Sequence, residues 1–269
     1  MKNRPRTAIF PVAGRGTRMR PATLAVPKEL LPVVDTPLID FAIDEAIEAG
    51  CERLVFVTHP DKDAIRQHVL ARHEHRADIH FVNQPRALGL GHAVYCARGA
   101  SLPGPVAVLL PDDVILGPKG CLSEMVAVNA PRGHRIATMP VIRAHVSRYG
   151  ILSARHTVGP LIPANGIVEK PAPEEAPSTL AVVGRYILDA DIFDALAATP
   201  PGAGGEIQLT DAIAATSRSV GLNGVMFTGR RFDCGCKEGL LEATMARAAL
   251  DPAYAHIVDK PRKPAIHAA

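Results

Sequence analysis

Near its start the chain reads Ala8-Ile-Phe-Pro-Val-Ala-Gly-Arg-Gly-Thr-Arg-Met19, followed by Pro27-Lys28-Glu29. The apolar run at the beginning predicts a buried strand, and the strand leads directly into a loop with Gly14 and Gly16. Such a loop can direct backbone N–H groups at an anion, and the nearby cations of Arg18 and Lys28 suit a polyphosphate. The stretch therefore indicates nucleotide chemistry at the start of a domain.

The glycine loop does not match the two common nucleotide-binding motifs. A dinucleotide-binding loop needs a third glycine and an immediate helix, but the third glycine is missing and Pro21 and Pro27 oppose a helix. The Gly-Lys-Ser/Thr of a Walker loop is also absent. Taken alone, Gly14-Arg-Gly16 is equally compatible with a structural turn.

Composition restricts the class of protein further. The chain has 269 residues, 47% of them hydrophobic, which is enough for a substantial core. A net charge of +3 and 4% aromatic residues argue against a nucleic-acid partner. No apolar run reaches the roughly 18 residues that a membrane span needs, and we expect neither a signal peptide nor a membrane partner. Five cysteines, mostly isolated, suit the reducing cytoplasm.

Alternating strands and helices predict an α/β fold. We expect a Rossmann-like, mixed but mainly parallel sheet flanked by helices, with a smaller β-rich part beyond about residue 135. Residues 1–250 then form a single domain, with a nucleotide-binding half at about 1–135 and a second half at about 136–250; the tail 251–269 is expected to be poorly ordered. The expected strands are Thr7–Phe10, Arg53–Thr58, Ile79–Val82, Val106–Leu110, Arg135–Val141, Gly150–Ser153, Gly166–Glu169, Leu180–Leu188 and Val225–Thr228. The expected helices are Leu38–Ala49, Asp61–Ala71, Gly91–Ala97, Asp189–Ala198, Gln208–Ser217 and Lys237–Leu250.

A second group of polar residues follows the third expected strand. Gln84 lies near the carboxyl end of that strand, where open α/β sheets bind ligands, and its amide suits the edge of a pyrimidine. Gly89 would let the backbone approach a base closely. On spacing alone, however, Gly89-Leu-Gly91 is more simply interpreted as the turn that begins a helix.

Two carboxylates end the apolar strand Val106–Leu110. Asp112 and Asp113 are either solvated residues at the start of a loop or metal ligands, and the local sequence does not distinguish these possibilities. Asp233, which follows another apolar region, favours the metal interpretation. Mg²⁺ prefers one or two carboxylates together with phosphate oxygens and water, and two aspartates from separate strands meet that need.

Several segments of the second half carry groups that could hold a sugar phosphate. Glu169 could accept two hydroxyl protons, and Lys170 could meet a phosphate as a point charge. Alone, Glu-Lys-Pro is more simply a surface turn. Other tempting clusters have structural interpretations: we expect Cys234 and Cys236 to be incidental loop thiols, and His68, His73, His75 and His80 to lie on a solvated polar face.

Together these motifs, in their order from about Thr7 to Leu250, resemble the sugar-nucleotide pyrophosphorylases, which join a nucleoside triphosphate to a sugar 1-phosphate. Gly89-Leu-Gly-His-Ala93 and Gly204–Asp211 look like the UTP–glucose-1-phosphate uridylyltransferase branch. The resemblance implies the nucleotide-diphospho-sugar transferase fold and transfer of a uridylyl group from UTP to α-D-glucose 1-phosphate, giving UDP-glucose and pyrophosphate. It also implies Mg²⁺ as cofactor and a cytoplasmic homodimer or homotetramer.

Site roles follow from the same resemblance. It makes Arg18, Lys28 and Lys170 the catalytic cations, Asp112 and Asp233 the Mg²⁺ ligands, and Asp113 a neighbour only. The implied nucleotide-binding residues are Ala13, Gly14, Gly16, Thr17, Glu29, Gln84, Gly89 and Asp112. The implied sugar-phosphate residues are Tyr149, Gly150, Glu169, Lys170, Val183, Gly184 and Glu206.

Two rival functions remain open from the sequence. A thymidylyltransferase that uses dTTP would share the fold and the metal site, although Pro27-Lys28-Glu29 favours the uridylyl branch. A non-catalytic homologue that binds sugar nucleotides should have lost a cation or carboxylate, and none of the expected ones is missing. The chain departs from the family at Cys236 and Leu88, and in a short connection before Ile79, which leaves the oligomer in doubt.

Overall fold

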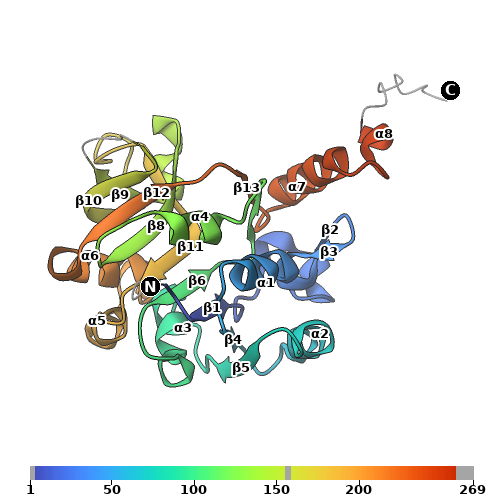
Figure 1. Ribbon diagram of the computed structural model, residues 1–269, viewed down its shortest axis with the longest axis horizontal. Coiled ribbons are helices and arrows are strands. Elements are labelled where there is room, and N and C mark those ends of the chain that lie inside the picture. The colour runs from blue at the N-terminus through green and yellow to red at the C-terminus, as the bar shows by residue number, and fades with distance from the viewer. Residues whose placement is uncertain (1–3, 155–158, 259–269) are drawn as a thin grey trace.

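A computed structural model describes residues 4–154 and 159–258 (Figure 1). Its centre is a nine-stranded mixed sheet. In spatial order the strands are β5 (Asp78–Asn83), β4 (Arg53–Thr58), β1 (Thr7–Pro11), β6 (Val106–Leu109), β11 (Leu180–Leu188), β8 (His134–Pro140), β12 (Leu222–Met226), β10 (Leu161–Glu169) and β9 (Gly150–Ala154).

The sheet is mixed, as expected, but less parallel than expected. The first four strands pair in parallel, with Ile9 of β1 opposite Val55 of β4 and Val108 of β6. In the second half only β8 and β12 pair in parallel, while β11 and β10 run antiparallel to their neighbours. For β9 with β10 and β11 the reason lies in the connections, because parallel neighbours need a long crossover and the described residues between these strands contain no helix.

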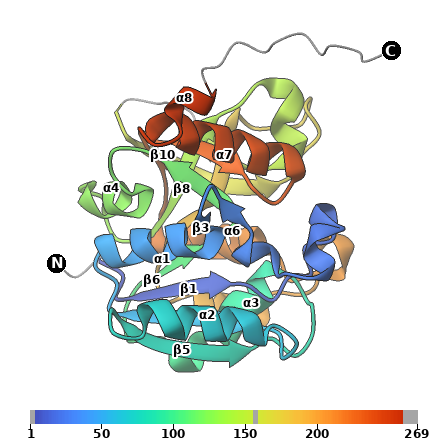
Figure 2. The same ribbon diagram turned by 90° about the vertical axis from the view of Figure 1, so that its right-hand side faces the viewer.

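Helices cover both faces of the sheet (Figures 1 and 2). One buried cluster combines β1, β4 and β6 with helices α1, α2 and α4, and a second packs the opposite face against α3, α5 and α6. This arrangement explains why β1 and β6 are continuously apolar, since both faces of each strand are buried. The helices are α1 (Leu38–Glu48), α2 (Asp63–His73), α3 (Leu90–Cys96), α4 (Cys121–Ala127), α5 (Ile192–Ala198) and α6 (Leu209–Val220).

A smaller layer brings the metal-site candidates together. Strands β7 (Asp113–Leu116) and β13 (Arg230–Asp233) form an antiparallel pair. The pair shares a small core with β2 (Pro32–Val33), with the start of α1 and with helix α7 (Lys237–Leu250), and β2 pairs with the short strand β3 (Thr36–Pro37). Strand β7 and helix α4 were not expected from the sequence, although β6 and α3, which have the same lengths of four and seven residues, were.

The expected elements are found with shifts of a few residues at their ends; β4, β11 and α7 have the expected bounds. In the tail, α8 (Ala255–Val258) forms a short helix where poor order was expected, and residues 259–269 lie outside the described residues. Within residues 4–154 and 159–258, no helix is long and apolar enough to cross a membrane.

Candidate active site

The glycine loop folds as a series of short turns after β1. The 3-10 turns η1 (Thr17–Met19), η2 (Ala22–Leu24) and η3 (Lys28–Leu30) replace the helix that the prolines oppose. Gly16 has a φ of 61°, and the Thr23 hydroxyl donates to its carbonyl oxygen at 2.8 Å. A Cβ on Gly16 would lie 3.2 Å from Cβ of Lys28, so the loop lies directly on that lysine.

Lys28 contacts the first candidate metal ligand. Its Nζ donates to Oδ2 of Asp112 at 2.5 Å, and both side chains are largely buried. Burial alone would lower the pKa of Lys28, but the carboxylates of Asp112 and Glu29 outweigh it and raise that pKa. Burial would likewise raise the pKa of Asp112, and Lys28 reverses this and lowers it. The pair is therefore ionised on both sides.

Glu29 lies behind the loop. Its Oε2 accepts a hydrogen bond from Nζ of Lys62 at 2.9 Å, and the same amine donates to the carbonyl oxygen of Val12. Glu29 is 2% exposed. Glu29, Gly16 and Thr17 line neither of the two cavities that meet at Asp112. Glu29 thus anchors the loop through Lys62, while within the described residues its Oε1 is buried without a hydrogen-bond partner.

Asp112 and Asp233 converge on Gly235. A Cβ at Gly235 would lie 3.0 Å from Oδ2 of Asp112 and 3.1 Å from Oδ1 of Asp233, and 2.7 Å from Nη2 of Arg18. Only glycine leaves this space open. Two carboxylates from different strands around one open point are a donor set that suits a hard divalent cation with remaining positions for phosphate and water.

One cavity, of about 410 Å³, lies above the glycine loop. Gln84 is almost fully buried at its edge, and its Nε2 donates to the carbonyl oxygen of Gly89 at 3.1 Å and lies 3.1 Å from Nδ1 of His92. Gly89 has a φ of 93°, which favours glycine. The expected residues that line this cavity are Ala13, Gly14, Lys28, Gln84, Gly89, Asp112 and Glu206.

Glu206 lies on this side rather than beside the sugar-side residues where it was expected. The backbone explains its position: Ile207 N–H donates to the carbonyl oxygen of Leu88 at 2.7 Å, and Gly91 N–H donates to that of Ile207 at 2.8 Å. These bonds hold residues 206–207 against the loop at Gly89, where a Cβ would come within 2.7 Å of Cβ of Glu206.

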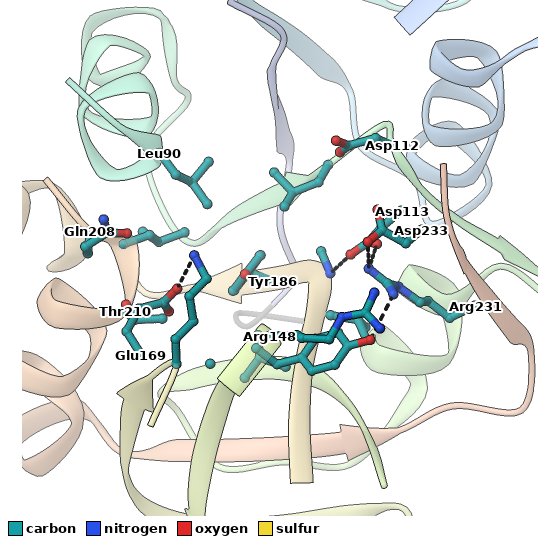
Figure 3. A pocket seen from close by; sticks show the side chains of 18 of the residues that line it. Leu90, Asp112, Asp113, Arg148, Glu169, Tyr186, Gln208, Thr210, Arg231 and Asp233 are labelled. Carbon is teal, nitrogen blue, oxygen red and sulfur yellow. Dashed lines mark hydrogen bonds and ion pairs between the residues drawn. The ribbon is translucent and has the colours of Figure 1, made fainter. Parts of the chain in front are cut away.

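A second cavity, of about 580 Å³, adjoins the first (Figure 3). Leu90, Leu110 and Asp112 line both, so the candidate metal site lies at their junction. Arg18 and Asp233 line the second cavity together with the remaining sugar-side candidates. These lie directly after η5 (Arg143–Arg148), on β9 and β11, and at the end of β10. Those candidates are Tyr149, Gly150, Glu169, Lys170, Val183 and Gly184.

Lys170 is held in an unusual backbone conformation. Its φ is +44°, its N–H donates to the carbonyl oxygen of Tyr149 at 3.0 Å, and its Nζ lies 3.4 Å from Oε1 of Glu169. A Cβ on Gly150 would lie 3.3 Å from Oε2 of Glu169, so the lysine, the carboxylate and the glycine form one group. A non-glycine residue in this region is strained, which is common at functional sites.

Comparison with known proteins identifies the family. Residues 8–249 match the family described as Nucleotidyl transferase. The chain belongs to the nucleotidyl transferase family. Two similar curated relatives are UTP–glucose-1-phosphate uridylyltransferases: one from Komagataeibacter xylinus is 42% identical over 86% of this chain and 89% of its own, and one from Escherichia coli K12 is 42% identical over 88% of each.

Solved structures agree with this assignment. A UDP-glucose pyrophosphorylase complexed with UDP-glucose has a TM-score of 0.83 and 36% identity, covering 90% of this chain and 98% of that one. A UTP-bound enzyme of the same kind from Acinetobacter baumannii has a TM-score of 0.84 and 36% identity, covering 94% and 96%. The expected fold is confirmed, and this nucleotidyl transferase is an enzyme of a family that acts on nucleotides.

Four residues that line the second cavity of this nucleotidyl transferase were missed in the sequence. Arg148 precedes Tyr149, and Tyr186 lies in a fully buried strand. Thr210 is 7% exposed, and within the described residues its Oγ1 has no hydrogen-bond partner. Arg231 was detectable, because it lies two residues before Asp233 and so on the same face of β13.

In this nucleotidyl transferase the solvated interpretation of the histidines was wrong for His73, whereas His75 is exposed as expected. His73 is 1% exposed, and Nε2 of both His68 and His73 lies within 2.9 Å of Oδ1 of Asp40. Such a group could hold a metal ion. Arg76, however, can only donate, and it lies 3.0 Å from Nδ1 of His73, so His73 carries its proton on Nε2 and donates to Asp40. The cluster therefore acts as a hydrogen-bonded clamp between α1 and α2.

Proposed function

We propose that this nucleotidyl transferase transfers a uridylyl group from UTP to α-D-glucose 1-phosphate, giving UDP-glucose and pyrophosphate. The observation that carries the proposal is the junction of two cavities at Asp112. One is lined by the glycine loop and Gln84, and the other by Glu169 and Lys170. A nucleotide and a sugar phosphate bound there would meet beside two carboxylates and two cations.

The residues suit a direct displacement. A phosphate oxygen of the sugar phosphate attacks the α-phosphorus of UTP, and the bond to pyrophosphate breaks as the new P–O bond forms. Arg18 and Lys28 would hold the triphosphate, and Lys170 would hold the attacking phosphate. These fixed cations stabilise the charge that develops on the phosphoryl and pyrophosphate oxygens, so no protein nucleophile is needed.

Recognition of the two substrates would fall to different residues. Gln84, Gly89 and the loop residues Ala13 and Gly14 would contact the nucleotide. Glu169 would accept hydrogen bonds from two sugar hydroxyls, with the close approach of the ring permitted by the glycines of that side. The halves at about 1–135 and 136–250 would then correspond to nucleotide and sugar binding within a single domain, 1–250.

A divalent cation completes the proposed site. Nucleotidyl transferases of this family generally use one, and we assign it as Mg²⁺, held by Asp112 and Asp233. The open space at Gly235, between the two carboxylates, supports this assignment. When bound, the cation would neutralise phosphate charge and orient the α-phosphoryl group.

The proposal is tested by pyrophosphate release from UTP, glucose 1-phosphate and Mg²⁺. We expect release with the purified protein, loss on addition of EDTA, and at least a roughly hundredfold loss of kcat in Asp233→Asn, with an unchanged melting temperature. Asp194→Asn, at an exposed carboxylate paired with Arg98, is the matched control. An intact wild type that releases no pyrophosphate would refute the proposal.

The same assay separates the rival functions. Initial rates with UTP that exceed those with dTTP support the uridylyl assignment, and the reverse order makes the chain a thymidylyltransferase. A regulatory homologue would bind UDP-glucose without turnover.

We also propose a cytoplasmic homodimer or homotetramer. Exposed apolar side chains on the terminal helices support assembly, since large solvent-facing apolar groups on one helix commonly mark an interface. They are Leu241 and Met245, one helical turn apart on α7, and Leu250 and Ile257 beyond them.

A further inference from the structure

Two aspartates face each other across the β7–β13 ladder. Asp113 is the register partner of Asp233, so two carboxylates lie directly opposite on neighbouring strands, an arrangement that is destabilising when both are charged. Arg231 lies two residues before Asp233 and points to the same face. Its guanidinium is therefore the cation that lies beside both carboxylates (Figure 3).

Arg231 contacts the carboxylate of Asp113 more closely than that of Asp233. Its Nη2 is bonded to Oδ1 of Asp113, whereas Oδ2 of Asp233 lies 4.0 Å from the same nitrogen. Its Nη1 donates to the Tyr149 hydroxyl at 3.5 Å, and its Cζ lies 5.5 Å from the centre of the Tyr149 ring. The guanidinium is thus held by Asp113 and Tyr149, and its contact with Asp233 is the longer one.

Asp113 is itself rigidly placed. Its Oδ2 accepts a hydrogen bond from Gly184 N–H at 2.6 Å, and the residue is 7% exposed. A Cβ on Gly184 would lie 2.7 Å from that oxygen, so the absence of a side chain there lets the carboxylate reach β11. Asp113 therefore joins the sugar-side strand to the hairpin that carries Asp233.

These contacts leave the carboxylate of Asp233 available to bind a cation. Its Oδ1 accepts only a 3.2 Å bond from Gly235 N–H within the described residues, and its Oδ2 is no closer than 3.9 Å to Arg18 Nη1. A carboxylate bound directly by a guanidinium is a poor metal ligand, because the cation must first be displaced. The ion pairs of Asp233 with Arg18 and Arg231 are long, at 3.9 and 4.0 Å, so neither guanidinium is within hydrogen-bond distance of Oδ2.

We propose that Asp113 is a positioning residue for the metal site: it holds the Arg231 guanidinium away from Asp233, so that Asp233 stays free to bind the cation. This inference rests on the proposed function, in which Asp233 is a metal ligand. Without the Asp113 carboxylate, Arg231 would need to move by only about 1 Å to pair with Asp233 at hydrogen-bond distance.

A double-mutant cycle on metal affinity tests this role. The variants are Asp113→Asn, Arg231→Met and their combination, and the readout is Mn²⁺ binding to the UDP-glucose complex, followed by the electron paramagnetic resonance signal of free Mn²⁺. Asp113→Asn removes a negative charge in either background, but it can release a competing cation only when Arg231 is present. The coupling between the two changes therefore isolates the positioning effect.

We expect Asp113→Asn alone to weaken Mn²⁺ binding about tenfold or more, and to weaken it less than about threefold in the Arg231→Met background. Equal weakening in both backgrounds would overturn the positioning role and leave a simple charge effect. Melting temperatures establish that each variant is folded. The exposed pair of Arg98 and Asp194 provides a matched cycle, Asp194→Asn with Arg98→Met, in which no coupling is expected.

Pyrophosphate release by the wild type keeps this test separate from that of the proposed function. A wild type without turnover refutes the function and the positioning role together. An active wild type with no coupling between Asp113 and Arg231 refutes the positioning role alone.

Discussion

Lys28 contacts Asp112 and also lines the cavity above the glycine loop. Its Nζ is paired with Asp112, the proposed metal ligand, at 2.5 Å. A triphosphate in the adjoining cavity offers the lysine a second set of oxygens. The pairing implies that the amine and the metal compete for Asp112, and that the nucleotide relieves the competition by engaging the lysine.

Replacing Lys28 by Met should therefore have opposite effects on two measurements. We expect kcat to fall by about two to three orders of magnitude, because a fixed cation on the triphosphate is lost. We expect the nucleotide-free protein to bind Mn²⁺ more tightly than the wild type by calorimetric titration. Arg20→Met, at an exposed arginine of the same loop that lines neither cavity, is the control. Weaker metal binding in the lysine variant would contradict the competition.

Gly235→Ala should impair the metal site while leaving the fold intact. The added methyl group would fill the point that Asp112, Asp233 and Arg18 surround. We expect loss of most turnover and a raised Mg²⁺ requirement, with a melting temperature within about 2 °C of the wild type. Gly99→Ala, where the new Cβ has no neighbour within 4 Å, is the matched control. An unchanged Mg²⁺ dependence would place the metal elsewhere.

At the scale of elements, β8 is joined to α6 by a buried neutral histidine. His134 accepts a hydrogen bond from Asp189 N–H on Nδ1, so its Nε2 carries the proton and faces the Thr216 hydroxyl at 2.9 Å. Burial lowers the pKa of His134 to about 4, and nearby Asp189 and Asp191 only partly oppose this. Between pH 6.5 and 4 the unfolded chain binds more protons at this residue than the folded chain does, so stability falls as the pH falls.

This residue should contribute about 2 kcal/mol to the loss of stability between pH 7 and pH 5. His134→Asn keeps an acceptor for Asp189 N–H but cannot be protonated. We expect the variant to be less stable at pH 7, because the bond to Thr216 is lost, and to show a flatter pH dependence. Urea unfolding at both pH values measures the difference. Equal pH dependence in the two proteins would show that His134 titrates normally.

The longest elements were located from the sequence, whereas elements of four to seven residues were located in some cases, such as β6 and α3, and missed in others. β11 has a run of nine buried residues and α7 spans fourteen, and both were located with their correct bounds. β7 and α4 have four and seven residues, and neither was expected. The local pattern also does not predict the direction of β11, because a continuous apolar strand can be buried in either orientation.

At the scale of the whole molecule, α7 and α8 extend from the sheet layers (Figure 1). If the exposed apolar side chains of α7 mediate assembly, Leu241→Asp with Met245→Asp should shift the sedimentation coefficient toward that of a monomer. The matched control is Ile142→Asp, at a residue that is 64% exposed away from these helices. A wild type that sediments as a monomer, or a variant that assembles normally, would contradict the proposed oligomer.

The apolar strands and the glycine loop were predictable from the sequence alone, as were the prolines that prevent a helix in that loop and the residue types around the loop. These features depend on side-chain patterns and on backbone restrictions, which act within a few residues. The sequence also indicated Asp112 and Asp233 as candidates, because carboxylates after apolar strands are conspicuous, whereas Lys170 became a candidate only through the family resemblance.

Which of these groups contact one another became known from the three-dimensional structure. It placed Glu29 behind the loop, moved Glu206 to the nucleotide side and buried His73 against Asp40. It also gave Asp113 and Arg231 their mutual contact across more than a hundred residues. Such positions depend on strand order, register and backbone pairing between distant segments, and no local pattern in a single chain carries that information.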